Sequence, residues 1–188
     1  MPSLIEHYEK YFGVIQHGWS KSADAIDMPF QVVECQEGTF KGVSCFATLG
    51  MSNYELGASV SGKAIRQELF LAAPTSLGAR NIPAVLQQIG NETINRGLAY
   101  LRGDVIGPRG CLFEGAAFQA IYVTMPVYFP EALKTFQGEE GCEIVIAWLV
   151  PITQSEAFYI RNHGWEKFES LLEREDPNLF DFDRSSLC

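Results

Sequence analysis

The chain has 188 residues, of which 47% are hydrophobic, so it can bury a substantial core in one domain and is rather short for two. Lys and Arg number 14 against 23 Asp and Glu, which gives a formal net charge of −9. Binding nucleic acid requires a basic surface that neutralises phosphates, so this charge argues against a nucleic-acid partner.

The sequence contains no uninterrupted apolar segment of about 18 residues and no basic start followed by a signal-peptide core. We therefore expect a soluble, cytoplasmic protein without a membrane partner. The cysteines are odd in number and scattered, which favours reduced thiols, mostly buried in strands, over a disulfide framework. They are Cys35, Cys45, Cys111, Cys142 and Cys188.

The first predicted element is a helix over residues 3–12, with Gly13 after its end. Its apolar side is formed by Leu4, Ile5, Tyr8 and Phe12. His7 lies on this helix, where we expect it to be exposed. Strands are predicted at residues 31–35, 43–49 and 68–72.

A second amphipathic helix begins at Ile82, because Pro83 is acceptable only in the first turn of a helix. Residues 118–129 predict a strand that tolerates Pro126 only at an edge or a bulge. We find no repeat or linker. The pattern predicts a single domain over residues 1–188, of class α+β (mixed α/β), with a mixed β-sheet flanked by helices.

Residues 142–150 form an apolar run bounded by Gly141 and Pro151, and β-branched and aromatic residues dominate it. Side chains alternate along a strand, so Ile146 and Trp148 share one face while Ala147 and Leu149 share the other. Both faces are apolar. We therefore predict an interior strand that is covered on two sides.

Thr153 stands three residues before Glu156, which is the spacing of a helix capping box. The helix that follows should bury Ala157, Phe158 and Ile160 and end near Gly164. A second helical stripe from Trp165 and Phe168 should continue until Asp176-Pro177. We interpret Trp165 and Phe168 as core residues, and expect Trp148 and Trp165 to lie in or beside the same core.

The acidic excess is concentrated in residues 166–183. Against three basic residues, Lys167, Arg174 and Arg184, there are seven acidic ones here: Glu166, Glu169, Glu173, Glu175, Asp176, Asp181 and Asp183. One interpretation is a solvated helix face that serves solubility. The other is a surface that steers a basic partner, such as a toxin that acts on nucleic acid.

Candidates for catalysis are few. His7, His17 and His163 are the only histidines and none has the spacing of a metal-ligand pair, so we expect no metal or cofactor. We interpret His17 and His163 as turn or helix-end residues. Cys111 follows the turn-like segment Gly107-Pro108-Arg109-Gly110, and a thiolate beside an arginine can be reactive, but a histidine would have to be supplied by the fold.

Several segments occur together in an order that is similar to the bacterial suppressor-of-fused (SUFU) domain family. In the C-terminal half these are Trp148-Leu149-Val150-Pro151-Ile152-Thr153, Gly164-Trp165-x-x-Phe168-x-x-Leu171-Leu172 and Asp181-x-Asp183-Arg184. Upstream they are Thr48-Leu49-Gly50-Met51-Ser52, Arg66-Gln67-Glu68-Leu69, Gly103-Asp104-Val105-Ile106-Gly107 and Ala120-Ile121-Tyr122-Val123-Thr124. The resemblance covers about residues 8–184.

This resemblance implies a mixed α/β fold without enzymatic activity, used to bind protein partners; many bacterial relatives are suspected immunity proteins against secreted toxins. The first hypothesis is therefore a non-catalytic binding module resembling suppressor of fused, with an immunity role against a toxin as its finer form. The alternative is a small hydrolase or transferase of unknown type that uses the loop at residues 104–111. The identity of the partner and the oligomeric state stay open.

Two loops are the least core-like surface candidates, one at Asn53-Tyr54-Glu55 and one from Gly103 to Gly110. Tyrosine and arginine are enriched among binding hot spots, so Tyr54 and Arg109 are the predicted binding residues, with Asp104 as a charged anchor. The competing interpretation is that Asp104 satisfies turn amides and Tyr54 rests against the core.

Overall fold

The computed structural model of the chain describes residues 3–57, 64–138 and 141–188. Within these ranges the strands form one mixed sheet in the order β1-β2-β3-β5-β9-β7-β6, in which β4 pairs with β5 and β8 with β9. Among the strand pairs of the described residues, only β5 and β9 run parallel. The strands are β1 (Gly13–Lys21), β2 (Asp27–Glu37), β3 (Val43–Leu49), β4 (Leu56–Gly57), β5 (Ala64–Pro74), β6 (Val105–Ile106), β7 (Phe118–Thr124), β8 (Thr135–Gln137) and β9 (Glu143–Thr153).

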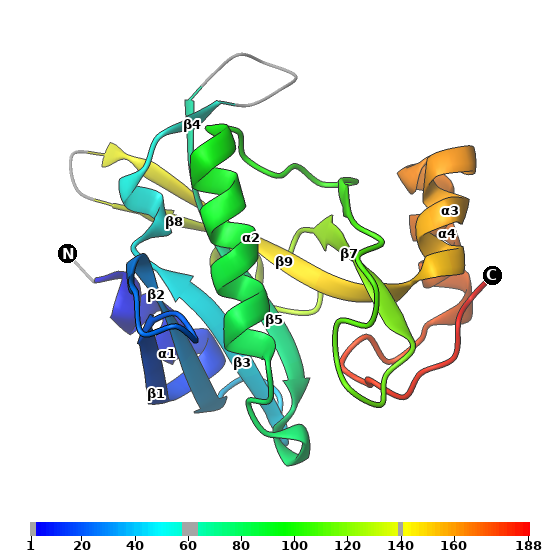
Figure 1. Cartoon of the computed structure of the whole chain (residues 1–188), viewed down its shortest axis with the longest axis horizontal. Coiled ribbons are helices and arrows are strands. Elements are labelled where there is room, and N and C mark those ends of the chain that lie inside the picture. The colour runs from blue at the N-terminus through cyan, green and yellow to red at the C-terminus, as the bar shows by residue number, and fades with distance from the viewer. Residues whose placement is uncertain (1–2, 58–63, 139–140) are drawn as a thin grey trace.

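Helices cover both faces of this sheet (Figure 1). They are α1 (Leu4–Phe12), α2 (Ile82–Arg96), α3 (Gln154–His163) and α4 (Trp165–Glu175), with short 3-10 turns η1 (Met51–Asn53), η2 (Thr75–Leu77) and η3 (Glu131–Leu133). Helix α2 packs on one face of the sheet, while α1, α3 and α4 pack on the other. The predicted mixed α/β class, with a sheet flanked by helices, is confirmed.

Strand β9 is the interior strand that the sequence predicts. It lies between β5 and β7 and contributes to both hydrophobic clusters. Ile146 and Trp148 face the cluster under α1, α3 and α4, whereas Ala147 and Leu149 face the cluster under α2. Alternation along the strand therefore places apolar side chains in two separate cores.

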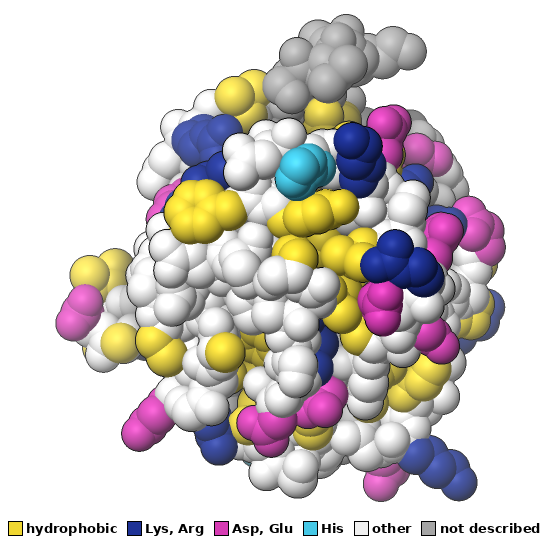
Figure 2. All heavy atoms as spheres, turned by 90° about the vertical axis from the view of Figure 1, so that its right-hand side faces the viewer, with side chains coloured by type: hydrophobic (Ala, Val, Ile, Leu, Met, Phe, Trp, Pro, Cys, Tyr) yellow, Lys and Arg dark blue, Asp and Glu magenta, His cyan; other side chains and the backbone are white. Residues whose placement is uncertain are grey.

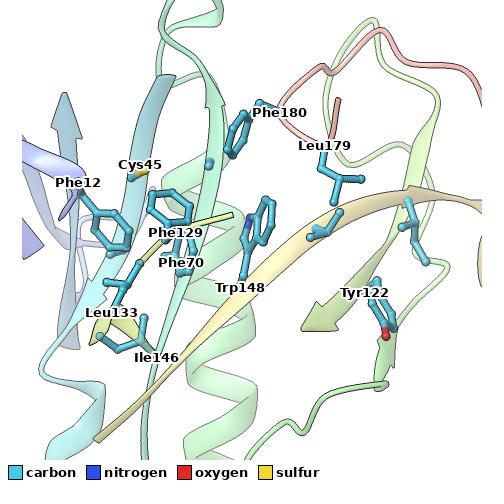
Figure 3. Packing of buried hydrophobic residues seen from close by; sticks show 14 of the residues in the cluster. Phe12, Cys45, Phe70, Tyr122, Phe129, Leu133, Ile146, Trp148, Leu179 and Phe180 are labelled. Carbon is cyan, nitrogen blue, oxygen red and sulfur yellow. The ribbon is translucent and has the colours of Figure 1, made fainter. Parts of the chain in front are cut away.

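Trp148 lies at the centre of the larger core, among aromatic rings from distant parts of the chain (Figure 3). Its ring centroid is 6.0 Å from that of Phe70 on β5 and 5.7 Å from that of Phe180. The rings of Tyr128 and Phe129 also lie near it, at 5.2 and 6.3 Å. Trp165 is partly buried against the same cluster, so the prediction that both tryptophans lie in or beside the same core is confirmed.

The predicted capping box starts α3. The Thr153 hydroxyl accepts from the Glu156 amide at 3.2 Å, and the Glu156 carboxylate accepts from the Thr153 amide at 2.7 Å. The helix ends at His163 and is capped by Gly164, whose φ of 88° is a conformation that favours glycine. Phe158, which we expected to be buried, is 47% exposed, because it falls on the outer side of α3.

Three other expectations were wrong in the N-terminal half and at the end of β7. His17 lies in β1, opposite Glu34 of β2, rather than in a turn. His7 is partly buried, with its ring against those of Tyr11 and Phe136. The strand that we expected over residues 118–129 ends at Thr124, because Pro126 lies two residues later and cannot donate a ladder hydrogen bond.

All five cysteines are free thiols. Cys35 and Cys45 are buried in paired strands, but Cys111 and Cys188 are exposed and Cys142 is partly buried, so the expectation of mostly buried cysteines was wrong. No helix among the described residues is long and apolar enough to cross a membrane.

Candidate partner-binding surface

The turn that precedes Tyr54 is held by hydrogen bonds to a buried glutamate. Glu68 of β5 is fully buried, and its carboxylate accepts from the Gly50 amide at 2.9 Å and from the Ser52 amide at 3.0 Å. The Thr48 hydroxyl donates to the other carboxylate oxygen at 2.6 Å. Burial raises the pKa of Glu68, and these hydrogen bonds oppose that rise. Two of the sequence segments that resemble the SUFU family thus meet through this one side chain.

Tyr54 follows the 3-10 turn that this network supports, and its side chain is 38% exposed. Arg66 also holds the turn, because its guanidinium donates to the Ser52 and Asn53 carbonyls at 2.8 and 3.0 Å. Tyr54 therefore follows a well-supported turn, which lowers the entropy that a contact there would cost.

The second predicted segment is engaged within the chain. Asp104 is exposed, and one of its carboxylate oxygens accepts from the Leu101 amide at 2.8 Å. Arg109 donates to Glu92 of α2 at 2.7 Å, and the guanidinium holds the pKa of Glu92 below its ordinary value. The Gly107 carbonyl accepts from Arg161 of α3. These contacts anchor the loop between α2 and α3.

Cys111 borders a cavity of about 190 Å³ between α2 and the strand pair β6–β7. Its thiol donates to the Phe113 carbonyl at 3.1 Å. Arg109 lines this cavity, and no histidine of the described part of the chain does. Among the described residues, the lining of this cavity therefore brings no histidine to the thiol, and a histidine is what the alternative enzymatic hypothesis requires.

The acidic helix α4 lies against the Gly103 segment, so the structure joins two surfaces that the sequence suggested separately. Arg102 forms an ion pair with Glu169 of α4, and its guanidinium lies 5.1 Å from the Trp165 ring. A Cβ atom at Gly103 would lie 2.6 Å from that ring, so only glycine allows this approach.

Glu169 is the polar centre of this contact. The Tyr122 hydroxyl on β7 donates to Glu169 at 2.7 Å, and the Arg102 Nε donates to it at 3.0 Å. Burial alone would raise the pKa of Glu169, but these two donors, the charge of Arg102 and the Thr124 hydroxyl together outweigh burial and leave the pKa below its ordinary value. The pKa of Tyr122 is raised, mainly by burial and to a smaller extent by the hydrogen bond to Glu169.

Beside this contact is a hollow of about 370 Å³ between α4 and residues 122–128, which we call the α4 groove. Its apolar lining comes from Val127, Tyr128, Val150, Leu172 and Leu179. Sequence reasoning missed it, because we assigned residues 125–129 to a strand. The two prolines that flank residues 127–129 were the signal that the chain leaves the sheet there.

The named binding residues do not form one patch. Figure 1 shows the η1 segment, which precedes Tyr54, and the segment before β7, which contains Asp104 and Arg109, on opposite sides of α2. Figure 2 looks onto the end that carries α3 and α4, where hydrophobic side chains gather among charged ones.

Solved structures similar to this chain share its fold. A suppressor of fused homolog from Neisseria gonorrhoeae has a TM-score of 0.74 at 18% identity, and the match covers 98% of this chain and 94% of that one. A chain in the Sufu–Fu complex structure has a TM-score of 0.56 at 13% identity, and the match covers 95% of this chain and 82% of that one. Drosophila Suppressor of Fused has a TM-score of 0.60 at 14% identity, covering 85% of this chain and 43% of that one.

No curated protein matches the sequence. The family model for suppressor of fused protein (SUFU) matches residues 27–185, which is most of the chain. The match includes every segment that carries the resemblance in the sequence, from Thr48-Leu49-Gly50 to Arg184. The chain therefore belongs to the suppressor of fused family.

Proposed function

We propose that the chain is a non-catalytic binding module for a protein partner. The observation that carries this proposal is the exposed acidic surface of α4 and the segment after it. Glu166, Glu173, Asp176 and Asp183 are exposed there, and none of them forms an ion pair within the described residues. The Sufu–Fu complex supports the proposal, because in it a protein of the same fold is bound to another protein.

The finer form of the proposal is an immunity protein that acts in the cytoplasm and neutralises a basic toxin domain. A toxin that acts on nucleic acid needs a basic surface, and an acidic surface would both attract that toxin and cover the site. The binding residues in this proposal are Tyr54, Asp104 and Arg109. If the interface lies elsewhere, the acidic helix α4 is the next surface to test.

The partner can be sought by pull-down from the native cell and among the products of neighbouring genes. For the immunity form, growth of a host that expresses the candidate toxin should be restored only when this chain is expressed with it. Failure to restore growth, despite binding, would refute the immunity role and leave the binding role intact.

Calorimetry with the purified partner tests the named residues. Tyr54→Ala and Arg109→Ala should each weaken binding by at least about tenfold if they are hot spots. Arg80→Ala is the matched control for Arg109, because Arg80 is also exposed and also makes a contact within the chain. Wild-type affinity in both variants would place the interface elsewhere.

A further inference from the structure

The α4 groove has the size and lining of a site for a large apolar side chain. Its volume of about 370 Å³ is more than twice the roughly 150 Å³ of a cavity that holds benzene. Val127 is 54% exposed and Tyr128 is 36% exposed, although both are apolar or aromatic. Exposed apolar surface of this kind, inside a hollow with a polar rim, is typical of a binding site.

The groove is also held in shape before any ligand arrives. The Tyr128 hydroxyl donates to the Pro177 carbonyl at 3.1 Å. The Tyr128 ring packs edge-on against Trp148 and Phe180, with centroid distances of 5.2 and 5.6 Å. A wall that is fixed by buried aromatic residues loses little entropy on binding.

The rim of the groove is negative. Glu169 and Arg102 neutralise each other, whereas Glu173 and Asp176 are exposed and take part in no ion pair of the described structure. Asp176 lines the hollow together with Tyr128, and its charge, after burial, helps to raise the pKa of Tyr128. A cation at the rim would therefore meet acids next to the apolar hollow.

Resting on the proposed binding function, we propose that the α4 groove receives an aromatic side chain of a protein partner that is flanked by Lys or Arg. The ring enters the hollow against Val127, Tyr128 and Leu172. The flanking cations lie at Glu173 and Asp176. The apolar volume selects the ring, and the acidic rim selects the charge of its neighbours.

Defined peptides test this proposal without knowledge of the natural partner. The probe is a capped pentapeptide with a central phenylalanine between two lysines, titrated into the isotope-labelled protein and followed by NMR. We expect saturable shifts at the backbone amides of Val127, Tyr128 and Leu172. A peptide with glutamates in place of the lysines, and one with alanine in place of phenylalanine, should each bind at least about threefold more weakly.

Two variants with matched controls locate the binding. Glu173→Lys should weaken the basic peptide by about threefold to tenfold, whereas Glu9→Lys, the same change on α1, should not. Val127→Glu should abolish it, whereas Val14→Glu on β1 should not, although Val14 is also 54% exposed. Absence of saturable binding to the wild type, or equal losses in variants and controls, overturns the proposal.

Two further outcomes separate this proposal from the function on which it rests. A natural partner that binds Val127→Glu and Glu173→Lys as tightly as wild type would refute the groove and leave the binding function standing. Self-association that Val127→Glu abolishes, without any binding of the peptide, would assign the groove to a second copy of the chain and also overturn the proposal.

Discussion

Removing the buried carboxylate of Glu68 should destabilise the protein strongly. In Glu68→Ala, the Gly50 and Ser52 amides lose the acceptor that they reach at 2.9 and 3.0 Å. A buried group left without its partner costs about 1–3 kcal/mol, so the two amides together should cost about 2–6 kcal/mol, toward the lower end because Gly50 is only partly buried. The turn before Tyr54 should loosen as a result.

Glu68→Gln is the informative comparison, because its amide oxygen can still accept from both backbone amides. Its NH₂ group can donate to the Thr48 hydroxyl, which can turn its own proton toward the Leu69 carbonyl 3.4 Å away. We therefore expect Glu68→Gln to be at least about 2 kcal/mol more stable than Glu68→Ala. Urea unfolding followed by tryptophan fluorescence measures both, with the exposed Glu114→Ala as a control within about 0.5 kcal/mol of wild type.

Ionisation of the buried Glu68 carboxyl should make the stability of the protein depend on pH. Burial raises the pKa of Glu68 above its ordinary value of 4.5, so the folded protein releases this proton at higher pH than the unfolded chain. The stability that the protonated carboxyl contributes is present below about pH 4.5 and is lost as pH rises through the folded pKa. The stability of Glu68→Gln relative to wild type should therefore increase from about pH 4.5 toward neutrality. A constant difference over that range, or Glu68→Ala within about 1 kcal/mol of wild type, would refute the account of Glu68.

Three other predictions concern the core, the C-terminal contact and catalysis. Trp148→Ala should cost about 3–5 kcal/mol in a denaturant titration, and wild-type stability would contradict its central place in the core. Arg184→Met should cost about 3–5 kcal/mol, because it leaves the fully buried Glu156 carboxylate without its cation, and a loss below about 1 kcal/mol would show that the ion pair is dispensable. A broad substrate screen should find no hydrolytic turnover, and turnover lost in folded Cys111→Ala or Asp104→Asn would overturn the binding-module proposal.

Local patterns made most of the helices and the interior strand predictable. The capping box of Thr153 and Glu156 needs only neighbouring residues, and the two apolar faces of β9 follow from alternation alone. Strand β1 was missed because most of its residues are exposed and Gly18 interrupts the pattern. Its pairing with β2 is a tertiary contact that no feature within residues 13–21 indicates.

The candidate surface was less predictable than the fold for the same reason. Tyr122 and Glu169 are 47 positions apart in the sequence and meet only because α4 folds back onto β7. The sequence suggested the Gly103 loop and the acidic segment as separate surfaces, and it could not show that Arg102 joins them. The groove between α4 and residues 122–128 depends on this long-range contact.

The charge of the C-terminal surface shows how burial changes an argument made from composition. Arg184 counts as one of the three basic residues of the acidic segment, but it is 9% exposed and binds Glu156 in the interior. Its charge is therefore taken up by a buried carboxylate and does not offset the acids on the surface. Glu169 is likewise neutralised by Arg102, so the exposed field comes mainly from carboxylates such as Glu173 and Asp176. A basic partner would interact with these exposed carboxylates rather than with the net charge of the whole segment. Salt would screen the exposed carboxylates but leave the buried pair of Arg184 and Glu156 intact.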